Sequence, residues 1–312
     1  MTTFAFVFPG QGSQAVGMLA AWGDHPAVRQ TLDEASQALG EDIAALIANG
    51  PKEQLDLTTN TQPVMLTAAI AAWRAWQAEG GAMPMALAGH SLGEYSALVA
   101  AGSLSLADAL PLVRFRAQAM QQAVAVGAGA MAAILGLAPE QVHEGCAEAA
   151  KATGDVVAAA NFNDPKQTVI SGSKAGVAKA CELLKAMGAK RALLLAVSAP
   201  FHCALMKPAA DALRERLLSV TVSPPQIPVI NNVDVAAPTD ADAIRDALYR
   251  QAFGPVRWVE VVQALRQRGA THLVECGPGK VLAGMVKRID AEALSAAVYD
   301  PASLAEVKGL LA

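Results

Sequence analysis

A serine between two glycines, Gly89-His90-Ser91-Leu92-Gly93, is the feature that most constrains how this chain can fold. The run before it, 85–89, is predicted to be a short buried strand, and the Ala-rich run 91–102 is predicted to be a helix. A Gly-x-Ser-x-Gly turn from strand to helix is typical of a nucleophile elbow, which holds a serine hydroxyl out of the backbone. Glycine is expected on both sides because a side chain there would collide with the neighbouring strand or helix. We therefore interpret Ser91 as a nucleophile.

The composition indicates a globular protein with one large core or two unequal ones. Of the 312 residues, 53% are hydrophobic and only 17% are charged, and the net charge of −4 gives no support to nucleic-acid binding. The first residues lack the pattern of a secretory signal, and no apolar run has the length of a membrane helix. The four cysteines have no metal-site or redox spacing, so we expect reduced thiols in a cytoplasmic protein without a metal.

The alternation of predicted strands and helices indicates an α/β fold with a mainly parallel sheet. Further strands are predicted at 4–8 and 271–275, and a loop at 55–60. Helices are predicted at 26–39, 42–48, 61–78, 106–124, 204–220, 240–251 and 259–269, with a final helix after 279.

A composition shift at 127–129 begins a stretch of shorter elements. They are predicted in the order strand, helix, strand, strand, helix, strand, at 130–135, 139–151, 156–161, 168–171, 174–187 and 192–196. This β-α-β-β-α-β order is the ferredoxin-like pattern. We therefore expect 127–197 to be a small inserted domain, and 1–126 together with 198–312 to form the larger catalytic domain.

The glycine-rich loop 9–14, which follows the first predicted strand, permits two interpretations. Gly10, Gly12 and Ala15 fit a permissive dinucleotide-binding fingerprint, with Asp33 at a suitable distance for a ribose. The proline of the loop is awkward in such a turn, and Asp33 lies within helical sequence rather than after a second strand. We favour a loop whose free backbone amides face a reacting group near the serine turn.

A serine nucleophile needs a base within hydrogen-bond reach. His202 is the best candidate because it follows a predicted strand on a proline-stiffened loop, where α/β sheets place their sites. The other histidines are weaker candidates: His25, His90, His143 and His272. Asp164 lies in the right interval for a triad acid but belongs to the predicted insert. We therefore hypothesise a dyad whose imidazole is oriented by a backbone carbonyl, while a histidine with a purely local role stays open.

Arg116 lies in the middle of a predicted helix, within Phe115-Arg116-Ala117-Gln118-Ala119-Met120. The pattern alone favours a surface arginine whose stem lies along its helix. The functional alternative is a guanidinium that binds a substrate carboxylate through two parallel hydrogen bonds. Such a charge-assisted bond is worth about 1.5–3 kcal/mol.

Four segments in combination resemble the malonyl-CoA:acyl carrier protein transacylases, and the similarity runs from residue 4 to about 290. The segments are Phe8-Pro9-Gly10-Gln11-Gly12-Ser13-Gln14, Gly89-His90-Ser91-Leu92-Gly93-Glu94-Tyr95, Ser198-Ala199-Pro200-Phe201-His202-Cys203-Ala204-Leu205-Met206 and Gly277-Pro278-Gly279. The resemblance implies an α/β-hydrolase-like large domain with a ferredoxin-like insert, in agreement with the element order. It also implies a transfer of malonyl groups from malonyl-CoA to acyl carrier protein for fatty-acid synthesis.

The resemblance assigns the reacting groups residue by residue. It implies that Ser91 is the nucleophile and that His202 is the general base and acid. Backbone amides of Gln11 and Leu92 would form the oxyanion hole. The reaction would be ping-pong, through a malonyl-serine intermediate and without a cofactor.

Substrate recognition is implied in the same way. Arg116 matches the arginine that binds the malonyl carboxylate, and Gln251 matches the residue whose main-chain carbonyl orients the histidine. Phe201 resembles the malonyl-selective form of the family, where methylmalonyl-selective domains often carry serine.

Acyl carrier proteins are acidic, so basic side chains are candidate docking groups, although each one is also typical of an ordinary solvated surface. The candidates are Lys190, Arg191, Lys280, Lys287 and Arg288. We expect a monomer that binds malonyl-CoA and acyl carrier protein but neither nucleic acid nor a membrane.

Alternatives from other classes stay open at this point. A serine esterase or thioesterase is disfavoured by the missing triad acid and by Arg116. A dinucleotide-dependent oxidoreductase would use the fingerprint in loop 9–14, and a non-catalytic docking subunit would not need Ser91 and His202. The sequence also leaves open a polyketide or malonate-decarboxylase pathway and the tolerance for methylmalonyl or acetyl groups.

Overall fold

Two β-sheets organise the chain in the computed structural model, which describes residues 2–312. The first has five strands in the order β7-β2-β1-β8-β9, and all neighbouring strands are parallel. Its strands are β1 (Phe4–Phe8), β2 (Ala86–Gly89), β7 (Val229–Ile230), β8 (His272–Cys276) and β9 (Leu294–Val298). The second sheet has four antiparallel strands in the order β4-β5-β3-β6. The predicted α/β fold with a mainly parallel sheet is therefore confirmed.

The central strand β1 is buried on both faces, as its unbroken apolar sequence requires for a strand inside a parallel sheet. Phe4, Phe6 and Phe8 point into one hydrophobic cluster, whereas Ala5 and Val7 point into the other. This alternation follows from the period of two along a strand. The parallel sheet thus separates two cores, one on each side.

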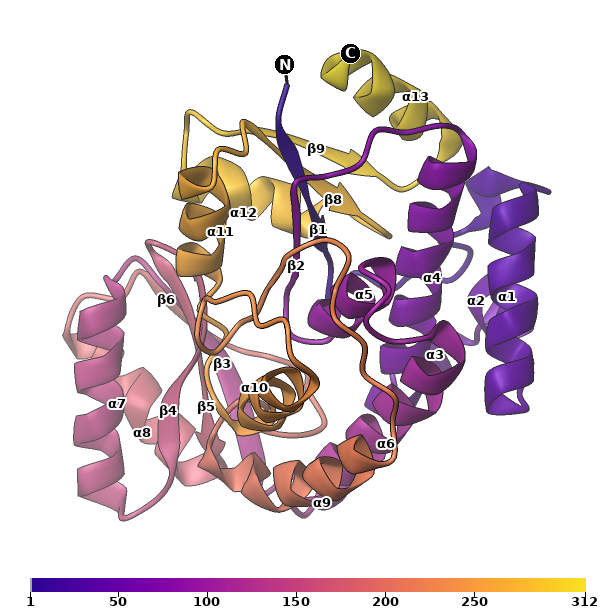
Figure 1. Cartoon of the computed structure of the whole chain (residues 1–312). Helices are drawn as coiled ribbons and strands as arrows, with labels where there is room; N and C mark the ends of the chain where they lie inside the picture. The colour runs from indigo at the N-terminus through magenta and orange to yellow at the C-terminus, as the bar shows by residue number, and fades with distance from the viewer. Residues whose placement is uncertain (1) are drawn as a thin grey trace.

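Helices cover both faces of the parallel sheet, and Figure 1 shows α11 and α12 on the opposite side from α4. The long helix α4 (Thr58–Ala78) is almost wholly buried, and Trp73 and Trp76 meet the ring of Phe6 edge-on, with centroids 5.7 and 5.3 Å away. Aromatic pairs prefer this geometry. The same side carries α1 (Pro26–Leu39), α5 (Gly93–Ala100) and α6 (Leu106–Gln122), and the other side carries α11 (Trp258–Gln267) and α12 (Val281–Ile289).

The second sheet and its two helices all lie between residues 129 and 194, inside the predicted insert. The elements are β3 (Gly129–Leu135), α7 (Pro139–Thr153), β4 (Val157–Asp164), β5 (Gln167–Ser173), α8 (Lys174–Ala186) and β6 (Arg191–Leu194). Their order in the chain and in the sheet is that of a ferredoxin-like unit. The boundaries at 127 and 197 remain a prediction.

Several predicted elements were wrong at their ends or were missed. The predicted loop 55–60 is largely helical, because α3 (Lys52–Leu55) and the first turn of α4 occupy it. The helix after residue 279 is not the last element, since β9 and α13 (Pro301–Leu311) follow. Both β9, rich in small residues, and the two-residue β7 lie at edges of the sheet, where pairing rather than local propensity defines a strand. The remaining helices are α2 (Ile43–Asn49), α9 (Lys207–Leu218) and α10 (Ala241–Phe253), with single 3-10 turns at Ala20–Trp22 and Ala204–Met206.

The two glycines around Ser91 are required by the close approach of three backbone segments. A Cβ atom at Gly89 would lie 1.9 Å from the carbonyl carbon of Gly93, and one at Gly93 would lie 2.1 Å from the carbonyl oxygen of Phe8. Real Cβ atoms do not come this close to backbone, so a methyl group at either position must push the turn apart. The elbow also places α5 two residues later than predicted, because Ser91 and Leu92 belong to the turn.

We expect Gly89→Ala to lower the free energy of unfolding by at least about 1–3 kcal/mol, because the added methyl group overpacks the turn. Gly309→Ala is a matched control: a Cβ atom at this position in α13 meets nothing within 4 Å. It should leave the stability unchanged or raise it by up to about 1 kcal/mol. Urea unfolding of both variants measures the difference, and an equally stable Gly89→Ala would contradict the steric argument.

Candidate active site

A cavity of about 580 Å³ lies where the carboxyl ends of β1 and β2 face the insert. Loop 9–14 and the elbow form one wall, the start of α12 forms another, and residues of the insert such as Met131 and Asn163 complete it. Sites in parallel α/β sheets form at this edge because the loops after neighbouring strands meet there. The cavity brings Gln11, Ser91, Leu92, Arg116 and His202 to one place, all of which the sequence singled out.

Ser91 occupies the strained position of the elbow, with a φ of 52° that L residues rarely adopt. Its backbone N–H donates to Asn232 Oδ1 at 2.8 Å, and Asn232 Nδ2 donates to the carbonyl of Gly89 at 2.7 Å. One asparagine side chain thus ties both ends of the turn. The strained conformation is held by contacts on each side of the serine.

Ser91 and His202 form a hydrogen-bonded pair, with 2.7 Å between Oγ and Nε2. On the other side of the ring, Nδ1 lies 2.9 Å from the carbonyl oxygen of Gln251 and 3.1 Å from that of Gly254. Since carbonyls only accept, the Nδ1 atom carries the proton and the lone pair of Nε2 faces the serine. This is the arrangement of a base oriented by backbone carbonyls.

The carboxylate of Asp164 lies elsewhere. Its Oδ2 accepts from Arg288 Nε at 2.7 Å, and its Oδ1 accepts from the backbone of Lys166 at 2.8 Å. Asp164 therefore does not orient His202, as expected from its position in the insert.

The imidazole of His202 is neutral under ordinary conditions. Burial lowers its pKa to about 3, and the nearby positive charge of Arg116 acts in the same direction. The hydrogen bonds from Nδ1 to the two carbonyls oppose this shift only in part. A neutral imidazole can accept the serine proton at any physiological pH.

Arg116 is buried, with 2% of its surface exposed, so the interpretation as a surface arginine is wrong. Its Nη1 donates to Gln62 Oε1 at 2.8 Å, and its Nη2 lies 3.0 Å from Gln251 Oε1 and 3.4 Å from Ser91 Oγ. The guanidinium also lies 5.4 Å from the centre of the Tyr95 ring. Burial lowers the pKa of Arg116, whereas the neighbouring Tyr95 and Glu94 raise it. The result is a desolvated cation directly beside the serine hydroxyl.

Gln11 and Leu92 line the same cavity. Within residues 2–312 neither of their backbone amides donates a hydrogen bond, whereas the amides of Gly12, Ser91 and Gly93 all do. The side chain of Gln11 is held by Thr58, whose Oγ1 donates to Oε1 at 2.8 Å. Two residues that line the cavity beside Ser91 therefore have backbone donors without an acceptor in the described part of the chain.

Four polar groups around this centre were missed at the sequence level: Gln62, Glu94, Asn163 and Asn232. Asn163 Oδ1 accepts a hydrogen bond from His90 Nε2 at 2.9 Å, and the His90 ring packs edge-on against Trp258. The contacts of the other three span 54 to 157 positions in the chain, so no local pattern indicates them. The only local signal was Glu94 itself, a charged residue in an otherwise buried helical turn.

The dinucleotide-binding interpretation of loop 9–14 does not fit the structure. No α-helix begins after this loop until Pro26, and Asp33 lies within α1 rather than at the end of a strand. A Cβ atom at Gly10 would lie 2.6 Å from the carbonyl oxygen of His90, so this glycine is needed for the contact with the elbow. In the described part of the chain, no group of three or more His, Cys, Asp or Glu side chains could hold a metal ion.

Comparison with known proteins places this geometry in a family. The Acyl transferase domain family matches residues 5–305. The malonyl CoA-acyl carrier protein transacylase of Salmonella typhimurium is 54% identical over 305 residues, covering 97% of this chain and 98% of that protein. The protein of the same name from Escherichia coli K12 is 53% identical over 306 residues and 98% of both chains.

Solved structures agree with the sequence comparison. An acyl-carrier-protein S-malonyltransferase from Burkholderia pseudomallei 1710b has a TM-score of 0.97 and 64% identity, over 99% of this chain and 100% of that one. A malonyl-transacylase solved in complex with its type II PKS acyl-carrier protein has a TM-score of 0.97 and 51% identity, over 99% and 100% of the two chains.

The fold and the site therefore define an acyltransferase, and the chain belongs to the acyl transferase domain family. Within that family its relatives place it among the malonyl CoA-acyl carrier protein transacylases. None of the helices in residues 2–312 combines the length and the apolar character that crossing a membrane requires.

The lowered pKa of His202 has a measurable consequence. We expect its ring to stay neutral from pH 8 down to about pH 5, because protonation would bury a second positive charge next to Arg116. In Arg116→Ala one cause of the lowered pKa is removed while burial and the nearby His90 remain, so the titration should move to higher pH. NMR of ring protons, assigned with His202→Asn, measures both, and a midpoint near the ordinary histidine pKa of about 6.5 in the wild type would contradict the burial argument.

Proposed function

We propose that this protein transfers the malonyl group of malonyl-CoA to the phosphopantetheine thiol of acyl carrier protein through a malonyl-Ser91 intermediate. The proposal rests on one observation above all: a buried guanidinium lies 3.4 Å from a serine hydroxyl that is itself paired with a neutral histidine. A simple serine hydrolase has no need of a desolvated cation beside its nucleophile. An enzyme whose acyl group ends in a carboxylate needs such a cation to bind that carboxylate.

In the first half-reaction, Ser91 Oγ attacks the thioester carbonyl while Nε2 of His202 takes the hydroxyl proton. The negative charge that develops on the carbonyl oxygen is stabilised by the amides of Gln11 and Leu92, which are preorganised donors. As the carbon–sulfur bond breaks, His202 returns the proton to the CoA sulfur. The products are free CoA and a malonyl ester on Ser91.

In the second half-reaction, the thiol of the carrier protein replaces CoA in the cavity. His202 takes the thiol proton, the thiolate attacks the ester carbonyl, and the same two amides stabilise the oxyanion. His202 then returns the proton to Oγ, which restores Ser91. The acid and base roles reverse between the two halves, as the near-symmetric chemistry of two thioesters requires.

The malonyl carboxylate also affects the base. When it binds Arg116 it offsets the positive charge that lowers the pKa of His202. The imidazole then becomes more basic at the moment when it must accept a proton. We infer that malonyl substrates activate His202, whereas acetyl substrates leave its pKa low. Phe201, which also lines the cavity, limits the room beside the acyl group.

We further propose an acidic carrier protein as the partner, which a complex of a 51% identical malonyl-transacylase supports. Of the candidate docking residues, Arg191 begins the exposed edge strand β6 and Lys190 directly precedes it. Arg288 is already paired with Asp164, and Lys280 lies over the Tyr299 ring. We expect the protein to serve fatty-acid synthesis in the cytoplasm as a monomer, since one chain supplies every group of the site.

Intact-protein mass spectrometry after mixing with malonyl-CoA tests the reaction. We expect one malonyl adduct in the wild type, none in Ser91→Ala, and loss of the adduct when acyl carrier protein is added. Arg116→Ala should lose about 10–100-fold of its preference for malonyl-CoA over acetyl-CoA, because a charge-assisted bond is removed. An adduct that water removes before any carrier is added would indicate a thioesterase instead.

Asp164 provides a test of the dyad. Because its carboxylate binds Arg288 and not His202, Asp164→Asn should retain a malonylation rate within a few-fold of the wild type. His202→Asn, in which the base is removed, should lose at least about 100-fold. Rapid-quench measurement of the adduct compares them, and a loss in Asp164→Asn as large as that in His202→Asn would show that the acid takes part.

A further inference from the structure

A carboxyl group that the proposed mechanism does not use lies in the helix that follows the nucleophile. Glu94, in the first turn of α5, is only 2% exposed. Its Oε2 accepts two hydrogen bonds, from the backbone N–H of Asn232 at 2.8 Å and from Gln251 Nε2 at 3.0 Å. Burying a carboxylate costs free energy, so we expect Glu94 to perform a structural role at this position.

We propose that Glu94 is a positioning residue that sets the orientation of the Gln251 side-chain amide and, through it, the arrangement of nucleophile, base and guanidinium. The inference rests on the proposed function, because it concerns how the groups of that same site are held. Glu94 touches neither substrate nor the reacting atoms in this arrangement.

The orientation of the Gln251 amide follows from its partners. Its NH₂ group donates to Glu94 Oε2 and to the carbonyl of Ser91, both at 3.0 Å, while its Oε1 accepts from Arg116 Nη2 at 3.0 Å. If the amide turned over, its NH₂ group would face the guanidinium and its oxygen would face two acceptors. An acceptor at Glu94 excludes that alternative and keeps Oε1 aimed at Arg116.

The same residue also orients the base. The backbone carbonyl of Gln251, in the last turn of α10, accepts from His202 Nδ1. Gln251 therefore contacts all three residues of the proposed site. Its side-chain amide donates to the carbonyl of Ser91 and accepts from Arg116, and its backbone carbonyl accepts from His202. Glu94 is the fixed point against which this one residue is held.

The second donor to Glu94 completes the scaffold. Asn232 gives its backbone N–H to Glu94 and uses its side chain to tie Ser91 N and Gly89 O. The carboxylate thus fixes both the residue that holds the elbow and the residue that orients the base. Deletion of Glu94 would leave two buried donors without an acceptor.

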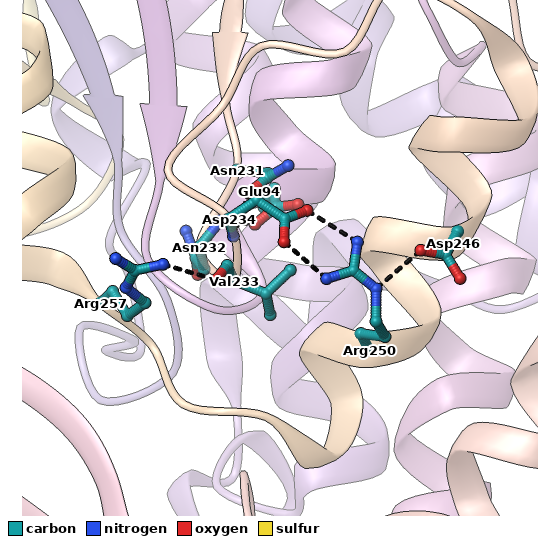
Figure 2. A network of polar contacts seen from close by, with 8 residues as sticks. All are labelled: Glu94, Asn231, Asn232, Val233, Asp234, Asp246, Arg250 and Arg257. Atoms are coloured by element: carbon teal, nitrogen blue, oxygen red, sulfur yellow. Dashed lines mark hydrogen bonds and ion pairs between the residues drawn. The ribbon is translucent and has the colours of Figure 1, made fainter.

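An outer clamp holds the loop of Asn232 against α10, and Figure 2 shows it beside Glu94. Asp234 binds Arg250 through two bonds of 2.6 and 2.7 Å, and Arg250 Nε binds Asp246 at 2.7 Å. From the other flank, Arg257 donates to the carbonyl of Val233 at 3.0 Å. Arg250 precedes Gln251 in the chain, and Asp234 follows Asn232 by two positions. The clamp therefore holds together the two segments that donate hydrogen bonds to Glu94.

The role of Glu94 depends on its acceptor oxygen more than on a full charge. Burial raises its pKa to about 7, although its hydrogen bonds with Gln251 and Asn232 and the charge of Arg116 favour the ionised form. The nearby Asp234 acts in the opposite direction. A neutral carbonyl oxygen at the same place can accept the same two bonds, so Glu94→Gln should preserve the scaffold.

The test compares malonyl-CoA with acetyl-CoA as acyl donors in single-turnover formation of the Ser91 adduct. In Glu94→Ala the Gln251 amide is released and Arg116 loses its fixed position, so the malonyl-to-acetyl rate ratio should fall about tenfold. Glu94→Gln should keep the ratio within about threefold of the wild type. Val28→Ala removes two buried methyl groups from α1, a helix that contributes no residue to the cavity. It is the control for general destabilisation and should leave the ratio unchanged.

Asp234→Ala covers the case in which Glu94→Ala does not fold. Asp234 is partly exposed, so its loss opens the outer clamp without a buried cavity, and the ratio should fall in the same direction by a smaller factor. In the Arg116→Ala background, Glu94→Ala should change the ratio no further. A ratio that stays at the wild-type value in both Glu94→Ala and Asp234→Ala would overturn the proposal. Absence of any malonyl adduct in the wild type would instead overturn the proposed function.

Discussion

The burial of a positive charge at Arg116 is the constraint on which the rest of the site depends. A guanidinium that is 2% exposed has lost most of its hydration, and such a charge is tolerated only where hydrogen bonds replace water. Its contacts include two amide oxygens, of Gln62 and Gln251, the hydroxyl of Ser91 and the face of the Tyr95 ring. All of these are neutral. The charge is stabilised without being paired, so it stays available to a carboxylate that enters the cavity.

The same constraint explains why Nδ1 of His202 meets backbone carbonyls rather than a carboxylate in the described part of the chain. A carboxylate within reach of both His202 and Arg116 would form an ion pair with the arginine and would raise the pKa of the histidine. Backbone carbonyls of Gln251 and Gly254 orient the ring without adding charge. Gln251 separates the buried carboxyl group of Glu94 from the guanidinium, because its side-chain amide hydrogen-bonds to both. The orientation of His202 by uncharged groups and the unpaired charge of Arg116 thus depend on each other.

How much of this the sequence predicted depends on how local each signal was. The elbow was predictable because Gly89, Ser91 and Gly93 form a turn whose requirements are steric and contiguous. The ferredoxin-like element order was predictable for the same reason, since each short strand and helix carries its own pattern. The burial of Arg116 was not, because a helix of mixed residues does not reveal which face meets α4. Short edge strands such as β9 were missed because their partners, rather than their residues, define them.

The insert is coupled to the base through one short segment, 254–257. Gly254 offers its carbonyl to His202, Val256 exchanges two backbone hydrogen bonds with the insert, at Ala160 and Phe162, and Arg257 holds the loop of Asn232. Four successive residues therefore connect the histidine, the elbow support and the opposite wall of the cavity. A transferase must admit two large thiols in turn while its base keeps one orientation. Anchoring the wall and the base to the same backbone segment meets that requirement, because any shift of the insert that widens the cavity acts on a segment held at three points.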